Sequence, residues 1–268
     1  MIVINSTQNE TYKKLVRLQE KKERTQTGLF LIEGYREILR ASEGEIQALQ
    51  LFICPEFFLG SNEKELIRFY EKRQLPVTQL APRLFEKLSF RDRPDGMLLL
   101  AKQFNTEIEA LEALLKKTSN PFLLIAEAIE KPGNLGSILR SCDAAGVDAV
   151  IVCDECTDIY NPNVIRSSVG TLFTVPIFEM SSQEAIALLK KQKIHIAAAT
   201  PSAQAVYTQV DFQRPVAIAV GTEQLGLSKL WMEQADLQVK IPMLGKADSL
   251  NVSNATTLLL YEVVRQRS

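Results

Sequence analysis

Six short apolar runs in the second half of the chain restrict the possible folds more than any other feature of the sequence. In chain order they read PFLLIAEA from residue 121, AVIVCD from 149, TVPIFE from 174, IHIAAAT from 194, PVAIAVG from 215 and LQVKIPM from 237. Most neighbouring residues within a run are apolar, so both faces of each expected strand must be buried. The pattern therefore predicts an α/β fold in which helices cover a parallel sheet.

The first half of the chain predicts a smaller α/β domain. A basic helical pattern at about residues 9–24 precedes the apolar run LFLIEGYR, and further helix and strand patterns follow as far as GMLLLAK. We interpret residues 1–103 as this domain and the charged segment 104–119 as a linker. Residues 120–268 form the predicted domain with the parallel sheet.

Composition and cysteine usage predict a soluble protein of a reducing compartment, with a cytoplasmic location. The chain has 268 residues, of which 46% are hydrophobic and 24% charged, and its formal net charge is -1. No run approaches the ~18 apolar residues of a membrane helix, and the first residues lack a signal-peptide pattern. Cys153 and Cys156 form a C-x-x-C without a second pair or a nearby histidine, so we predict no metal site.

Glycines and small polar residues follow three of the apolar runs directly, at residues 131–140, 221–228 and 241–252. Ligands of parallel sheets bind outside the carboxyl ends of the strands, so these segments should meet at one edge. None contains G-x-G-x-x-G or G-x-x-x-x-G-K-[ST], the fingerprints of dinucleotide and P-loop nucleotide binding. The stretch SLNVSNA at residues 249–255 also holds more small polar side chains than one helix cap requires.

In this order, the three segments resemble the motifs of the SpoU family of RNA ribose 2′-O-methyltransferases, which belongs to the knotted SPOUT class. The first motif, Asn-Leu-Gly followed by a helical Arg and Ala-x-Gly, matches residues 134–146. The second, Gly-x-Glu-x-x-Gly-Leu-Ser, matches residues 221–228. The third, Ile-Pro-Met followed by Ser-Leu-Asn-Val and Ala, matches residues 241–243 and 249–255. The chain departs from the family at Thr222, where Asn is usual, and at Glu130-Lys131, where an Asp is common.

The resemblance implies methyl transfer from S-adenosylmethionine to a ribose 2′-hydroxyl of RNA, with ribosomal RNA favoured over transfer RNA. It also implies a deep trefoil knot and a homodimer. The residues that would bind the cofactor are Thr200, Gly221, Ile241, Met243 and Leu250. The residues that would carry the chemistry are Asn134, Arg140, Glu223, Ser249 and Asn251. Ser253 or Asn254 would then cap the last helix.

Two roles are open for Arg140, which the resemblance places beside the attacking hydroxyl. A guanidinium is almost never deprotonated in proteins, so we favour a donor that holds a phosphate and stabilises the developing alkoxide over a general base. Glu223 would orient Asn134 or Arg140. His195, the single histidine, lies inside an apolar run, and we predict a buried strand residue there instead of a base.

The first domain resembles the L30e-like substrate-binding domain that is often fused to these enzymes. Six basic residues stand against two acidic ones between residues 11 and 24. On charge alone this pattern is typical of a solvated helix face, but lysine and arginine also supply most sequence-independent affinity for RNA. With the resemblance, we predict an RNA-contacting surface that consists of Lys13, Lys14, Arg17, Lys21, Lys22 and Arg24.

Other functions stay open for a chain with this pattern. One is a transfer-RNA ribose methyltransferase, and another is a SPOUT protein that binds RNA but has lost methyl transfer. A methylation assay would distinguish the second from an enzyme. A nucleotide-dependent oxidoreductase is disfavoured because the glycine fingerprint is missing.

Overall fold

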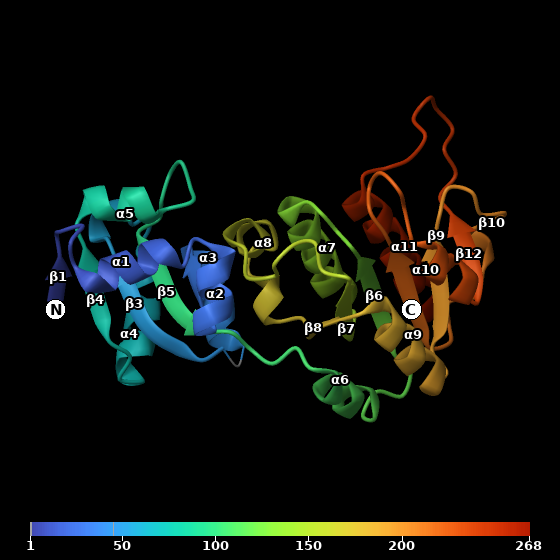
Figure 1. The fold of residues 1–268 in the computed structure, drawn as a ribbon, viewed down its shortest axis with the longest axis horizontal. Helices are drawn as coiled ribbons and strands as arrows, with labels where there is room; N and C mark the ends of the chain where they lie inside the picture. Colours follow the sequence, from blue (N-terminus) through green and yellow to red (C-terminus); the bar gives the residue numbers. More distant parts are fainter. Residues whose placement is uncertain (1, 45) are drawn as a thin grey trace. The chain divides into compact units, whose positions relative to one another are not determined.

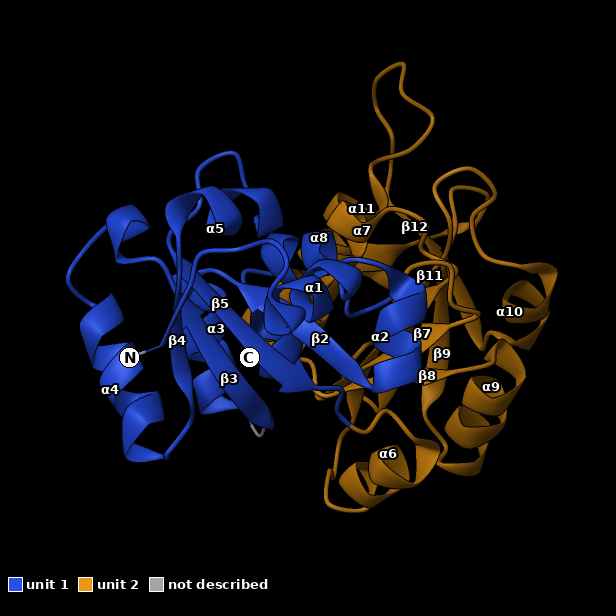
Figure 2. Ribbon diagram, turned by 60° about the vertical axis from the view of Figure 1, so that its left-hand side comes forward, with its two compact units in different colours: residues 1–104, 158–174 blue, residues 105–157, 175–268 orange. Residues whose placement is uncertain are grey.

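The computed structural model describes residues 2–44 and 46–268, which form two compact units (Figure 2). Unit 1 comprises residues 1–104 and 158–174, and unit 2 comprises residues 105–157 and 175–268. The chain therefore leaves unit 2 for one segment and then returns to it. The predicted division at residues 103 and 120 contains no such excursion, because nothing in the composition of residues 158–174 distinguishes them from their neighbours.

Unit 2 contains a seven-stranded parallel sheet in which all six predicted runs form strands. The strands are β6 (Phe122–Glu127), β7 (Ala149–Cys153), β8 (Ile177–Met180), β9 (His195–Ala199), β10 (Ala205–Val206), β11 (Val216–Val220) and β12 (Leu237–Lys240). Their order is β10-β12-β9-β11-β6-β7-β8. The predicted α/β class with a parallel sheet is confirmed, and the two-residue strand β10 is the only addition among the described residues of this unit.

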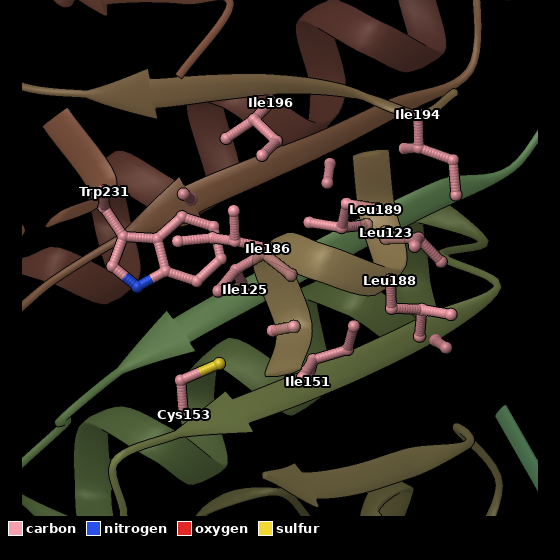
Figure 3. Packing of buried hydrophobic residues seen from close by; sticks show 14 of the residues in the cluster. Leu123, Ile125, Ile151, Cys153, Ile186, Leu188, Leu189, Ile194, Ile196 and Trp231 are labelled. Carbon is pink, nitrogen blue, oxygen red and sulfur yellow. The ribbon is translucent and has the colours of Figure 1, made fainter. Parts of the chain in front are cut away.

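Helices cover both faces of this sheet (Figure 1). They are α6 (Ile108–Leu115), α7 (Pro132–Ala145), α9 (Ser182–Lys191), α10 (Lys229–Gln234) and α11 (Val252–Arg267), with the short 3-10 helix η3 (Tyr207–Gln209). On one face, Leu123, Ile125 and Ile151 of the strands pack against Leu189 of α9 and Trp231 of α10 (Figure 3). Alternate strand residues point to the opposite face. There α7 and α11 pack together, and α11 contacts β11.

The strand order places a topological switch beside β6. From β6 the chain proceeds outward through β7 and β8, and it then crosses to the other side of β6, where β11 lies between β6 and β9. Loops that leave neighbouring strands in opposite directions open a crevice at the carboxyl edge of a parallel sheet. The three glycine-bearing segments lie at this edge, because they follow β6, β11 and β12.

Unit 1 contains a mixed sheet of order β1-β4-β3-β5-β2. Its strands are β1 (Ile2–Ile4), β2 (Leu29–Glu33), β3 (Ala48–Ile53), β4 (Val77–Leu80) and β5 (Met97–Lys102). Its helices are α1 (Glu10–Arg17), α2 (Lys21–Thr27), α3 (Tyr35–Glu43), α4 (Glu63–Lys72), α5 (Pro82–Leu88) and α8 (Pro162–Ser167), with the 3-10 helices η1 (Pro55–Phe57) and η2 (Thr171–Phe173). The predicted basic helix is two helices, because Glu20 takes an extended conformation between them.

Residues 158–174 are bound to the rest of unit 1 by a buried ion pair and by ring contacts. The Arg24 guanidinium is 3% exposed and lies 2.6 Å from the Asp158 carboxylate, and it also donates to the carbonyl of Leu18. The Tyr160 ring packs on Phe30 with 4.8 Å between ring centroids. The segment is therefore part of the core of unit 1, although it follows a strand of unit 2.

Asp158→Asn is expected to lower the free energy of unfolding by about 2 kcal/mol, the value of hydrogen bonds to a charged group. Asp158 accepts from Arg24 through Oδ2 and from the N–H of Tyr160 through Oδ1, so the amide would turn an N–H toward one of these donors and remove the charge that compensates the guanidinium. Chemical denaturation monitored by circular dichroism measures this change. As a control, Glu233→Gln breaks an exposed ion pair with Lys229 and should leave stability within about 0.5 kcal/mol. Equal stability of both variants would contradict the role of the buried pair.

Candidate functional site

A pocket of about 530 Å³ lies at the carboxyl edge of the sheet in unit 2. The ends of β9, β11 and β12, the loops that follow them and the start of α11 form its walls. Seven of the predicted site residues line it: Thr200, Gly221, Glu223, Ile241, Met243, Ser249 and Leu250. All five residues predicted to bind a cofactor are in this set. The volume is within the range of small-molecule sites.

The loop of residues 221–228 is tightly folded at its base. The N–H of Thr222 donates to the carbonyl of Gly226 at 3.1 Å, and the N–H of Gly226 donates back at 3.0 Å. A Cβ atom on Gly221 would overlap the carbonyl group of Gly226 and the backbone nitrogen of Leu227. Gly221 is therefore required by the close approach of two backbone segments at the pocket wall.

Asn251 joins the pocket segment to the start of α7. Its side-chain Nδ2 donates to Asn134 Oδ1 at 3.2 Å, and its Oδ1 accepts from the N–H of Ser253 at 2.9 Å. Asn251 is thus the N-cap of α11, and the prediction that Ser253 or Asn254 caps this helix is wrong. Asn251 takes the non-helical backbone conformation that a cap requires (ψ 138°), whereas Ser253 and Asn254 are already helical.

The amide nitrogen of Asn134 is buried and has no hydrogen-bond partner in the described structure. A buried donor without a partner costs free energy, and such groups in native proteins frequently bind a ligand or water. The Asn134 side chain therefore has a free donor nitrogen, with two N–H groups, next to the segment that carries Asn251.

Arg140 is exposed on α7, about one and a half turns beyond Asn134. It does not line the pocket. The next residue, Ser141, contacts Thr257 of α11 with 2.7 Å between their hydroxyl oxygens. Arg140 is thus beside the contact between α7 and α11 and has a side chain that reaches solvent.

Glu223 contacts Lys131, a residue that was not predicted to belong to the site. The Glu223 carboxylate forms an ion pair with the Lys131 ammonium group, and this hydrogen bond raises the pKa of Lys131. Neither Asn134 nor Arg140 hydrogen-bonds to Glu223 in the described part of the chain, which differs from the predicted orienting role. The sequence signal that could have identified Lys131 as a site residue was the Glu130-Lys131 pair, which stands where the family commonly has an Asp.

Glu127, the last residue of β6, is a second residue that sequence reasoning missed. Its side chain is 4% exposed, and its Oε2 accepts from the N–H of Ser228 at 2.7 Å. Ser228 is the last residue of the loop at the pocket wall. No local sequence pattern could show this contact. A glutamate that ends an apolar run is an ordinary polar residue at a strand end, and its partner lies in a distant segment.

The predicted RNA-contacting residues do not all reach the surface of unit 1. Lys14, Arg17 and Lys22 are exposed, as is Lys21, whereas Lys13 is half-buried and pairs with Glu10 at 2.8 Å. Arg24 is a correction to the predicted set, because its buried guanidinium is bound to Asp158 and to backbone carbonyls.

His195 lies at the amino end of β9, at the opposite edge of the sheet from the pocket, and is half-buried. Within residues 2–44 and 46–268, no cluster of three His, Cys, Asp or Glu side chains is arranged to hold a metal ion. No helix in the same ranges is long and apolar enough to cross a bilayer.

The chain belongs to the SpoU rRNA Methylase family, which residues 121–261 match. Residues 9–99 match the MRM3-like substrate binding domain. A Streptomyces viridochromogenes protein named 23S rRNA (uridine(2479)-2′-O)-methyltransferase is 31% identical over 93% of this chain and 87% of its own length. The Bacillus subtilis 23S rRNA (guanosine(2553)-2′-O)-methyltransferase RlmP is 28% identical over 97% of this chain and 98% of its own.

Solved structures share both units of the chain. A crystal structure of an RNA 2′-O ribose methyltransferase has a TM-score of 0.86 and 40% identity, and it covers 99% of each chain. The SpoU methyltransferase AviRb from Streptomyces viridochromogenes, solved in complex with the cofactor AdoMet, has a TM-score of 0.85 and 29% identity. That alignment covers 97% of this chain and 98% of AviRb.

Proposed function

We propose that this protein transfers a methyl group from S-adenosylmethionine to a ribose 2′-hydroxyl of ribosomal RNA. The observation that carries the proposal is the pocket in which residues of separate segments meet, since it contains every residue assigned to the cofactor. Relatives that align over most of both chains are named as 23S rRNA 2′-O-methyltransferases, which supports ribosomal over transfer RNA.

The residues of the pocket fit the proposed cofactor. Ile241, Met243 and Leu250 provide apolar surface for an adenine ring, and Gly221 allows a ligand to approach the backbone. The cofactor supplies an electrophilic methyl group when it is bound. The chemistry required of the chain is then to position the ribose and to stabilise charge that develops on its oxygen.

Four polar side chains would carry out that positioning. Ser249 lines the pocket, and Asn251 holds Asn134 through a hydrogen bond that leaves the buried Asn134 Nδ2 free to donate. Arg140 is a permanently charged donor with a solvent-exposed position from which it can meet RNA. We assign to it the stabilisation of the attacking oxygen and contact with the neighbouring phosphate.

The proposal is tested by single-turnover transfer of a labelled methyl group to 23S rRNA and to transfer RNA transcripts, followed by mapping of the modified ribose. We expect label at a 2′-oxygen of the ribosomal transcript. Label on transfer RNA alone would show that transfer RNA, and not ribosomal RNA, is the substrate. The absence of label on both RNAs would contradict an enzymatic function.

RNA affinity is expected to depend on the exposed basic residues of α1 and α2. Changing Lys14, Arg17 and Lys22 to Gln should weaken binding and flatten the dependence of log K on log salt by roughly one unit for each phosphate that the variant no longer neutralises. Filter binding across a salt series measures this slope. The control changes three exposed lysines of unit 2, Lys116, Lys117 and Lys229, to Gln. It alters the net charge by the same amount and should leave the slope unchanged. Equal slopes for both triple variants would indicate a solvated helix face.

The same proposal includes four further expectations. The protein is a homodimer, its methyltransferase domain contains a trefoil knot, and its location is cytoplasmic. The chain is divided into an RNA-binding domain (1–103) and a methyltransferase domain (120–268). Leu258 and Tyr261 of α11 are 41% and 47% exposed, which supports a second copy packed on this helix. Sedimentation equilibrium of the full chain and of Leu258→Lys tests the dimer. A monomeric wild-type protein would contradict it.

A further inference from the structure

We infer that Lys131 is a positioning residue for methyl transfer, which holds the Glu223 carboxylate and the exposed part of the 221–228 loop at the mouth of the pocket. The inference rests on the proposed function, because it concerns the same pocket. It is based on the contacts that join this loop to the segment of residues 127–131.

The loop is bound to that one short segment at two points, Ser228 at its end and Glu223 in its outer part. At the inner end, the buried Glu127 carboxylate accepts from the N–H of Ser228 at 2.7 Å. At the outer end, the Lys131 ammonium group donates to Glu223, whose side chain lines the pocket. The segment that connects β6 to α7 therefore determines where the pocket loop lies.

The two contacts differ in strength because they differ in burial. The Glu127 side chain is 4% exposed and its hydrogen bond to the N–H of Ser228 is partly buried, so water competes with it less than with the ion pair of Lys131. Lys131 and Glu223 are 69% and 27% exposed at their side chains, and exposed ion pairs contribute little to stability. The loop is thus fixed at Ser228 and can be released at Glu223.

The outer part of the loop has no other support in the described structure. The hydrogen bonds of residues 222–226 are internal, apart from the bond to Lys131. Leu225 at the tip is 89% exposed, so its side chain contributes no packing there. Lys131 is consequently the one side chain that hydrogen-bonds to the Glu223 carboxylate in the described part of the chain.

Helix stability does not explain a lysine at this position. Lys131 is the N-cap of α7 and makes no side-chain cap, and a cation is disfavoured at a helix N-terminus. Its carbonyl accepts from the N–H groups of Asn134 and Leu135 at 3.0 and 3.2 Å. The turn that carries Asn134 thus also fixes the backbone of Lys131. Through the Lys131 side chain, the position of Glu223 is linked to that of Asn134.

A double-mutant cycle tests whether Lys131 acts through Glu223. Lys131→Ala, Glu223→Ala and the double variant are compared for S-adenosylhomocysteine affinity by calorimetry and for the single-turnover rate on 23S rRNA. We expect Lys131→Ala to weaken affinity by about three- to fivefold in the wild-type background, in keeping with an exposed ion pair. In the Glu223→Ala background it should have no further effect. Lys131→Arg should retain wild-type affinity.

Lys229→Ala is the matched control, since Lys229 is 86% exposed, pairs with Glu233 just beyond the same loop and lies outside the pocket. It should leave affinity unchanged. Equal losses from Lys131→Ala in both backgrounds, or no loss in the wild-type background, would overturn the inference while leaving the proposed function intact. A wild-type protein that does not bind S-adenosylhomocysteine would instead defeat the proposed function.

Discussion

Arg140→Ala is expected to slow methyl transfer in a single turnover by about 100-fold or more, while the affinity for S-adenosylmethionine stays within about twofold. Loss of one preorganised donor at a developing oxyanion has an effect of this size. Cofactor affinity should be preserved because Arg140 is exposed on α7 and does not line the pocket. Rapid-quench measurements of transfer, with calorimetry on the same preparation, separate the two quantities.

Arg140→Lys should recover little of the lost rate, because an ammonium group cannot reproduce the planar fork of a guanidinium. Arg214→Ala is the control for loss of a surface arginine, since Arg214 is half-exposed and pairs with Asp211 near the amino edge of the sheet. Its rate should equal that of the wild type. A folded Arg140→Ala protein that methylates RNA at a near-normal rate would exclude Arg140 from the reaction.

Gly221→Ala is expected to weaken S-adenosylmethionine binding by about 100-fold. The added methyl group would overlap the backbone of Gly226 and Leu227, so the loop would have to open at its base. Overpacking of this kind typically costs about 1–3 kcal/mol, and about 2.7 kcal/mol corresponds to a hundredfold change in affinity. Calorimetric titration measures the affinity, and thermal unfolding shows whether the rest of unit 2 remains folded.

Gly133→Ala is the matched control for this glycine. Gly133 lies in the first turn of α7, and a Cβ atom there would meet nothing within 4 Å. Alanine is favoured over glycine in a helix, so this variant should bind cofactor normally and be slightly more stable. If both alanine variants bind equally well, the close approach at Gly221 is not needed for the pocket.

The strands of unit 2 and the pocket were predictable because their signals are local. Each of the six runs is apolar on both faces, which is sufficient to indicate a parallel sheet, and the motif residues follow the strand ends directly. Segments that end at neighbouring strands must meet, so the pocket follows from the sheet. In unit 1, β4 alternates half-buried and buried residues over only four positions, and its sequence gives a much weaker signal.

The contacts that sequence reasoning missed join residues far apart in the chain. Arg24 and Asp158 are separated by 134 positions, Glu127 and Ser228 by 101, and Lys131 and Glu223 by 92. Composition identifies a charged residue but not its partner. For this reason the sequence places Arg24 on the RNA-contacting surface and shows Lys131 only as a departure from the family.

The excursion of residues 158–174 into unit 1 has a consequence for the order in which the newly made chain can fold. A ribosome releases residues 1–104 first, but the carboxylate that neutralises the buried Arg24 and the rings that cover Phe30 emerge only after residues 105–157. Folding before then would bury the Arg24 cation without its carboxylate and leave the Phe30 ring uncovered, both of which disfavour a finished core. The core of unit 1 can therefore be completed only after residues 158–174 have been made, by which time the ribosome has already released the first two strands of the sheet of unit 2.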